Sequence, residues 1–152
     1  MKTFKDIVDT FQAGCAQHAA VNTFYYGTID KLDSTSQNVA YPYVFLRPLT
    51  SVGLVQNPNG QSANRSLTFE MYVLDIPKLT ESDYLQVMSD SEVIIYDLIS
   101  YFNLGASQRN NWINLTTITP VNEAFNDRVY GWVAEINYQE LAILDYCLFP
   151  TR

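Results

Sequence analysis

The sequence predicts an α+β fold in which two helices pack on one face of a largely antiparallel sheet. Two segments carry apolar residues at intervals of three and four, and the segments between them carry β-branched and aromatic residues that alternate with polar ones. Their order is one helix, three strands, a second helix and two strands. A chain of 152 residues has the usual size of one domain, so we expect a single domain over 1–152.

The first helix is predicted at about 4–19. Thr3 and Asp6 have the spacing of a capping box, and apolar residues then recur every three or four positions as far as Cys15. Gly14 lies inside this helix, where glycine costs about 1 kcal/mol relative to alanine. We therefore expect another element to pack closely against Gly14.

The second helix is predicted at about 80–103. Thr80 and Asp83 mark its start, and an apolar stripe runs from Tyr84 to Phe102. Its length of about 33 Å is enough to lie across a whole sheet. Asp90, Glu92 and Asp97 stand opposite the apolar stripe, and no Lys or Arg occurs between Thr80 and Tyr101. This acidic face suits solubility, a basic or amide-rich neighbour, or the lining of a channel.

The remaining segments predict strands. Two short runs interrupted by Gly27, Pro42 and Pro48 belong near sheet edges or bends. The longer runs alternate between a core face and a solvated face. The predicted strands are 22–29, 41–49, 66–76, 111–118 and 128–141.

A polar segment at about 51–65 predicts a long projecting hairpin or a mobile loop. Its centre, Asn57-Pro58-Asn59-Gly60, is a strong turn signal. A loop of this length in a small domain is usually functional or disordered. Asn57, Asn59 and Gly60 are therefore candidate interface residues.

The stretch 119–128 predicts an exposed loop before the last strand. Glu123 and Asp127 are four residues apart, so one helical turn would bring them together, with Arg128 as the local cation. No His, Cys or further ligand in the sequence supports a reaction there. We expect Glu123, Asp127 and Arg128 to form a salt-bridged turn or a contact between subunits.

The charge distribution argues against several functions. The net charge is −7, and the nine Lys and Arg residues are scattered singly, so binding to nucleic acid through phosphate neutralisation is not expected. No apolar run approaches the about 20 residues that span a bilayer. The eleven Tyr residues suit either a protein interface or a Tyr-rich sheet.

Few residues are candidates for catalysis. His18 is the single imidazole, and with Cys15 one turn earlier it would form a nucleophile and base only if both left the core. Glu70 and Glu135 lie mid-strand, where a shared face would suit a metal-dependent hydrolase and separate faces would leave two solvated charges. Cys15 and Cys147 form no CxxC pair, which indicates free thiols in a reducing cytosol. No glycine-rich phosphate loop is present, and no cofactor is expected.

Several segments together resemble the small tail-terminator, tail-completion and neck ring proteins of tailed bacteriophages, in the versions found in phages of Bacteroidetes, including crAss-like phages. The resemblance covers most of the chain in the family's order. It is carried by "HAAVNTFYYGTIDKLD", "YPYVFLRP", "LTFEMYVLDIPKLTESD", "SDSEVIIYDLISYF", "TPVNEAFNDRVYGWVAEI" and "DYCLFP".

This resemblance implies a structural subunit of the virion neck or tail, assembled in the host cytoplasm and without enzymatic activity. Such subunits form a homo-oligomeric ring of about six or twelve copies. The ring contacts portal, connector or tail proteins, and DNA passes through its channel without specific binding. The alternative from another class is a small-molecule-binding α+β module with an aromatic pocket.

Overall fold

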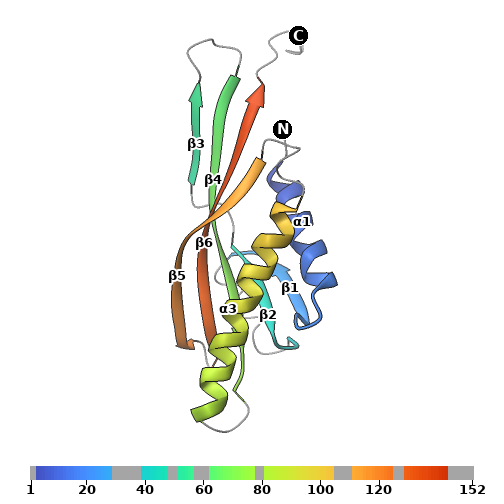
Figure 1. The fold of residues 1–152 in the computed structure, drawn as a ribbon, viewed down its shortest axis with the longest axis vertical. Coiled ribbons are helices and arrows are strands. Elements are labelled where there is room, and N and C mark those ends of the chain that lie inside the picture. The colour runs from blue at the N-terminus through green and yellow to red at the C-terminus, as the bar shows by residue number, and fades with distance from the viewer. Residues whose placement is uncertain are drawn as a thin grey trace.

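The computed structural model describes residues 3–28, 39–47, 51–56, 62–77, 81–104, 111–124 and 129–143. Two helices and six strands lie in these ranges (Figure 1). In chain order they are α1 (Phe4–Gln17), β1 (Thr23–Tyr26), β2 (Tyr43–Leu46), β3 (Ser51–Gln56), β4 (Ser62–Asp75), α3 (Glu81–Asn103), β5 (Asn111–Ala124) and β6 (Val129–Ile143).

The predicted α+β class is confirmed. The strands form one sheet in the order β1-β2-β4-β6-β5, and β3 pairs with β4 beside β2. All pairs are antiparallel except β1 with β2, which is parallel. β4 and β6 are the long central strands, and both helices lie on the same face of the sheet (Figure 1).

The main core lies between the helices and the sheet. Alternate residues of β4 and β6 point into it, as the period of two predicted, and they meet the apolar stripes of α1 and α3. Burial of these side chains is the main favourable contribution to folding. The buried members from β4 and β6 are Leu67, Phe69, Met71, Val73, Ala134, Ile136 and Tyr138.

The predicted close packing at Gly14 is confirmed. A Cβ atom at this position would lie 2.9 Å from the ring of Tyr101, so the missing side chain lets α1 approach α3. Gln17, one turn further along α1, donates a 3.1 Å hydrogen bond to the Tyr101 hydroxyl. The capping box of Thr3 and Asp6 is also present, and it satisfies backbone groups at the start of α1.

Polar side chains tie α3 to the sheet at two points. The indole Nε1 of Trp132 in β6 donates a 2.8 Å hydrogen bond to the carbonyl of Met88. Asn103, at the end of α3, exchanges two 3.0 Å hydrogen bonds with the backbone of Ile113 in β5. The helix is therefore fixed along its length, and its outward side has a defined direction.

The predicted end of β5 at residue 118 is wrong. The stretch 119–124, which we expected in a loop, continues β5 as far as Ala124, and so only 125–128 separate it from β6. Pairing with β6 supplies the hydrogen bonds, and register shifts after Leu115 and after Val121 accommodate the irregular sequence. Pro120 is tolerated because β5 is an edge strand, where a missing N–H need not break a ladder.

The segment at 51–65, for which the sequence left a hairpin and a loop open, contains strand at both of its ends. Ser51–Gln56 forms β3, which the sequence did not distinguish from the loop, and β4 begins at Ser62. The two strands pair antiparallel from Ser51↔Thr68 to Gln56↔Ala63. Residues 57–61 lie outside the described ranges, so the shape of the predicted hairpin tip stays a prediction.

Candidate interaction surface

The most unusual surface of the molecule lies at the end of the sheet that β3 occupies. β3 and the adjoining end of β4 extend past both helices (Figure 1). β3 pairs with β4 on one side, and among the described residues no strand pairs with its other side. A strand edge of this kind presents backbone N–H and C=O groups that another strand can pair with.

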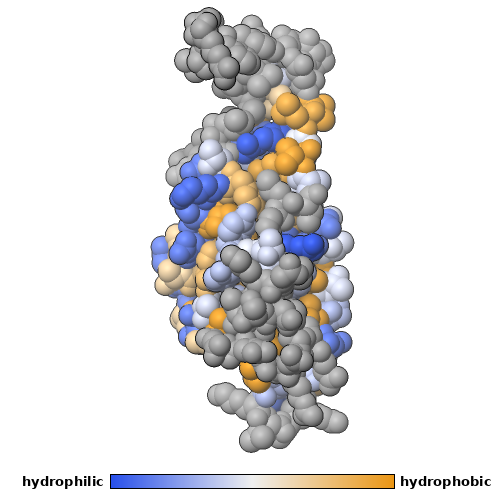
Figure 2. Space-filling view, turned by 180° about the vertical axis from the view of Figure 1, so that it is seen from behind, coloured by the Kyte–Doolittle hydropathy of each residue, from blue (hydrophilic) through white to orange (hydrophobic). Residues whose placement is uncertain are grey.

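Apolar side chains cover β3 on both of its faces. Val52, Leu54 and Val55 are 62%, 61% and 67% exposed. Figure 2 shows the apolar surface that they form at one end of the molecule. Native edge strands usually carry charges, prolines or bulges that prevent association, and the described part of β3 carries none of these. This edge has the character of a contact surface.

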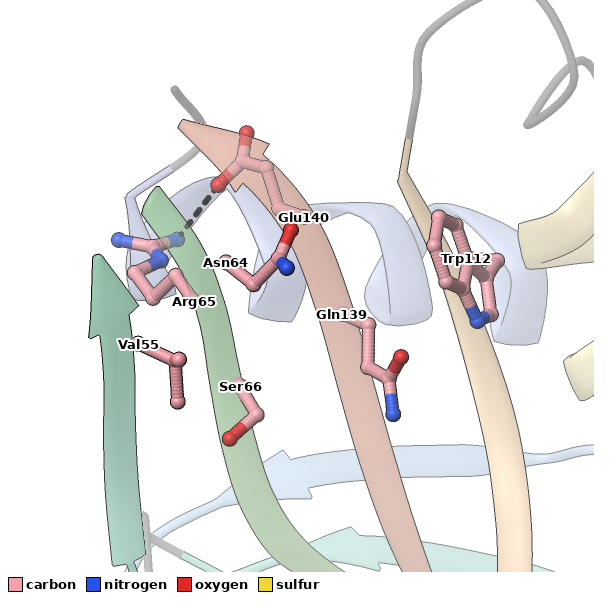
Figure 3. A pocket seen from close by; sticks show the side chains of 7 residues that line it. All are labelled: Val55, Asn64, Arg65, Ser66, Trp112, Gln139 and Glu140. Carbon is pink, nitrogen blue, oxygen red and sulfur yellow. Dashed lines mark ion pairs between the residues drawn. The ribbon is translucent and has the colours of Figure 1, made fainter. Parts of the chain in front are cut away.

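A groove of about 350 Å³ lies on the sheet beside β3 (Figure 3). Trp112 of β5 forms one wall and is 43% exposed, while Val55 of β3 lies at the opposite side. The floor between them is mostly polar. The lining residues are Val55, Asn64, Arg65, Ser66, Trp112, Gln139 and Glu140.

A buried ion pair links β4 and β6 at this end of the sheet. Arg65 of β4 and Glu140 of β6 are directly opposite each other, with 3.1 Å between Nη2 and a carboxylate oxygen. Their side chains are only 14% and 6% exposed, and the guanidinium lies 5.9 Å from the centre of the Tyr138 ring. Removing one partner of such a pair typically costs about 3–5 kcal/mol. The ion pair therefore joins β4 to β6 beyond the helices.

The described residues that flank the two groups of predicted interface residues lie at opposite ends of the sheet. Asn57, Asn59 and Gly60 lie outside the described ranges, between the paired ends Gln56 and Ala63. Asp127 and Arg128 also lie outside them, between the last pair Ala124↔Val129. Because Ala63 pairs with Ala142, at the far end of β6 from Val129, the two connections are separated by the length of the central strands.

Glu123 lies in a strand and not in the expected loop. The backbone of Glu123 is extended, and it belongs to β5 next to the end of the strand. A helical turn would break the pairing that joins Ala124 to Val129. Asp127 and Arg128 lie outside the described ranges, so the salt-bridged turn and the role of these residues as contacts stay predictions.

The structure gives the pair Cys15 and His18 no catalytic geometry. Cys15 is buried, and burial raises the pKa of its thiol from 9.0 to about 12. His18 caps α1, where its Nδ1 accepts a hydrogen bond from the Ala20 N–H and its Nε2 lies 3.2 Å from Asp97. With both ring nitrogens engaged elsewhere, His18 is a capping residue that links α1 to α3.

Burial of Cys15 is expected to slow its reaction with thiol reagents. In a Cys147→Ser variant, we expect Ellman's reagent at pH 8 to label Cys15 roughly a thousandfold more slowly than an exposed thiol, because the thiolate is the reactive species. The rate should rise to that of a free thiol in denaturing urea. Because burial favours the protonated thiol, the contribution of Cys15 to the stability of the native state is complete below pH 9. This contribution declines as the pH rises toward 12. Rapid labelling of the native protein would show that Cys15 is accessible.

Glu70 and Glu135 do share a face. They are directly opposite each other in β4 and β6, on the side of the sheet away from the helices. Glu70 accepts a 2.8 Å hydrogen bond from Arg47 and a 3.0 Å hydrogen bond from the Tyr72 hydroxyl. Burial raises the pKa of Tyr72, and the Glu70 carboxylate adds to this, while the hydrogen bond to Glu70 raises the pKa of Arg47. Within the described ranges no third acidic, His or Cys side chain joins the two carboxylates.

Two features of the surface were missed at the level of sequence. The first is the groove, whose only sequence signal is Trp112 alternating with the buried Ile113. The second is a set of apolar residues on the acidic side of α3. Leu85, Val93 and Tyr96 are 69%, 53% and 47% exposed, and a second series at helical spacing would have revealed them.

No protein-family model matches the chain, and no curated protein matches it. Within the described residues, neither helix combines the length and apolar character needed to cross a bilayer.

Proposed function

We propose that this protein is a structural subunit of a phage head-tail joint that assembles into a homo-oligomeric ring of the neck, tail-terminator or tail-completion type. The ring connects portal-side components with tail-side components, and DNA passes through its channel without specific binding. This function is not enzymatic. The protein then acts in the neck or tail of the virion.

The observation that supports the proposal best is the apolar outer edge of β3, with which no strand of the described ranges pairs. Strand addition at such an edge joins two chains through backbone hydrogen bonds, and neighbouring side chains give specificity. Val52, Leu54 and Val55 would then become buried between copies, which removes the cost of exposing them to water. The groove with Trp112 lies next to the same edge and offers a site for a side chain of the neighbour.

The arrangement of the strand ends also supports closure into a ring. A ring needs two different, complementary patches on each subunit, because the same interface repeats head to tail. The edge of β3 and the paired residues Ala124 and Val129 of β5 and β6 lie at opposite ends of the sheet. A contact between these two ends of adjacent copies would use two different patches.

The test is native mass spectrometry of the purified protein across a concentration series, alone and mixed with portal and tail-completion proteins of the same phage. We expect one closed species of defined subunit number, alone or on contact with a partner ring. A chain that stays monomeric at every concentration and joins none of these proteins would contradict the proposal.

Charge reversal at the other end of the sheet gives a second, independent prediction. We expect Glu123→Lys and Asp127→Lys each to impair assembly while the midpoint of urea unfolding changes little, since a contact between subunits contributes to assembly and not to the folding of the single chain. Sedimentation velocity measures assembly, and Asp9→Lys on the exposed side of α1 is the matched control. Normal assembly in both variants would remove Glu123 and Asp127 from the interface.

A second candidate function is supported by the groove alone. Its volume of about 350 Å³ falls in the range of about 300–1,000 Å³ found for small-molecule sites. Aromatic residues between the helices and the sheet instead pack against each other in the core, as Phe11 does with Phe69 and Phe102. A thermal-shift screen with a metabolite panel tests this candidate, and a ligand whose effect is lost in Trp112→Ala would favour it over a ring subunit.

A further inference from the structure

The outward side of α3 carries an exposed stripe of three apolar residues and two serines that the proposed ring contact at β3 does not use. Leu85, Ser89, Val93, Tyr96 and Ser100 follow one another at spacings of four, four, three and four residues, and all five are exposed. At 3.6 residues per turn, these positions fall within about a quarter of the helix circumference. Single exposed apolar residues are ordinary, but a continuous stripe along a helix is typical of a surface that packs against another element.

Acidic residues border this stripe on both sides. Asp90 and Asp97 lie along one side of it and Glu92 along the other, as the helical spacing places them. Asp90 accepts a hydrogen bond from Gln86, and Asp97 lies beside His18. No Lys or Arg occurs from Leu79 to Gln108, so the helix itself supplies no cation to balance these charges.

The described surface of a second copy does not complement this stripe. Each Lys and Arg in the described ranges already has a carboxylate partner: Lys5 with Asp9, Arg47 with Glu70 and Arg65 with Glu140. Two α3 helices packed together would also place acids of the same sign side by side, which is unfavourable. The charge pattern instead matches an apolar surface that is rimmed by Lys or Arg.

We propose that the outward side of α3 is a docking surface for a different protein, which presents an apolar helix or strand bordered by basic side chains. Apolar contacts with Leu85, Val93 and Tyr96 supply the affinity, and the acids select the partner and orient it. The inference rests on α3 alone, and it adds to the proposed function the surface that a non-identical component of the joint contacts.

A synthetic peptide tests the chemistry of this surface directly. The probe is a fluorescent amphipathic helix of about six turns with a Leu stripe flanked by Lys. A peptide with Glu in place of Lys and a scrambled peptide of the same composition serve as controls. We expect the Lys-flanked peptide to bind the wild-type chain, and both control peptides to bind at least about tenfold more weakly by fluorescence anisotropy.

Variants of the chain locate the site. We expect Val93→Ser/Tyr96→Ser to weaken binding of the Lys-flanked peptide at least about tenfold, and Asp90→Asn/Glu92→Gln to reduce its salt dependence. Val52→Ser/Leu54→Ser removes similar apolar surface from β3 and should leave binding within about twofold. All these side chains are at least partly exposed, so the fold should persist, which circular dichroism checks.

Three results would overturn the inference. The first is unchanged binding of the Lys-flanked peptide in Val93→Ser/Tyr96→Ser, and the second is equal binding of the scrambled peptide to the wild-type chain. The third is loss of self-association in Val93→Ser/Tyr96→Ser, which would make a second copy the occupant of α3. Failure of the proposed ring assembly is distinguishable from failure of this inference, because ring assembly proceeds through β3 and is measured without the peptide.

Discussion

The Gly131→Ala variant is expected to lose most of its folding stability, by more than about 4 kcal/mol. Gly131 lies in β6 opposite Leu74, and its φ angle of +154° is one that other residues rarely adopt. A Cβ atom there would lie 1.9 Å from the carbonyl oxygen of Val73. The clash is with backbone of a central strand, so it can be relieved only by separating β4 from β6.

Urea denaturation of the variant measures this effect, and Gly53→Ala is the matched control. A Cβ atom at Gly53 would meet the Ser66 hydroxyl, at 2.6 Å, which can rotate away. We therefore expect Gly53→Ala to change the free energy of unfolding by less than about 1 kcal/mol. Equal stability of the two variants would show that β4 and β6 do not approach as closely at Gly131 as the structure places them.

The double variant Val52→Lys/Leu54→Lys is expected to abolish assembly while it leaves the fold intact. Each apolar side chain buried in a contact contributes about 1.5–3 kcal/mol, so losing two weakens each interface by roughly a hundredfold or more. Lysine on an edge strand also prevents pairing with another strand. Both side chains are more than half exposed in the single chain, and so their replacement removes little from the core.

Sedimentation velocity and urea denaturation together measure this prediction. The control is Gln12→Lys/Ala16→Lys on the exposed side of α1, which adds the same charge at a distance from β3. We expect the control to assemble as the wild type does. Assembly of Val52→Lys/Leu54→Lys at wild-type concentrations would exclude the edge of β3 as the subunit contact.

The parts of the fold that depend on local periodicity were predictable from the sequence. Both helices begin and end within about two residues of the predicted positions, which is the usual uncertainty of helix ends. The alternation in β4 correctly assigned Leu67, Phe69, Met71 and Val73 to the core. Close packing at Gly14 was also predicted, since a glycine inside a helix costs stability that packing must offset.

The parts that depend on pairing between strands were not predictable. The extension of β5 through Pro120 to Ala124 is stabilised by β6, and the local sequence alone suggests a loop. β3 lies in a segment rich in turn signals, and only its register with β4 identifies it as a strand. The buried pair of Arg65 and Glu140 likewise arises from register, because the two residues are 75 positions apart in the sequence and opposite each other in the sheet.

The same distinction, between features that depend on local sequence and features that depend on the whole fold, applies to the candidate interaction surface. The sequence pointed to the region around Asn57–Gly60, but not to the exposed Val52, Leu54 and Val55 that precede it. It identified Asp90, Glu92 and Asp97 on the outward side of α3, but not the apolar stripe between them. In both cases the solvent exposure of an apolar residue depends on what the rest of the fold leaves uncovered.

Electron microscopy of the assembled protein distinguishes a ring subunit from a monomer or a filament. We expect closed rings of uniform diameter with a central channel, in the wild-type chain alone or bound to a portal-side or tail-side component, and no rings in Val52→Lys/Leu54→Lys. Open filaments of the wild-type chain, or only single subunits under every one of these conditions, would contradict the proposed ring assembly.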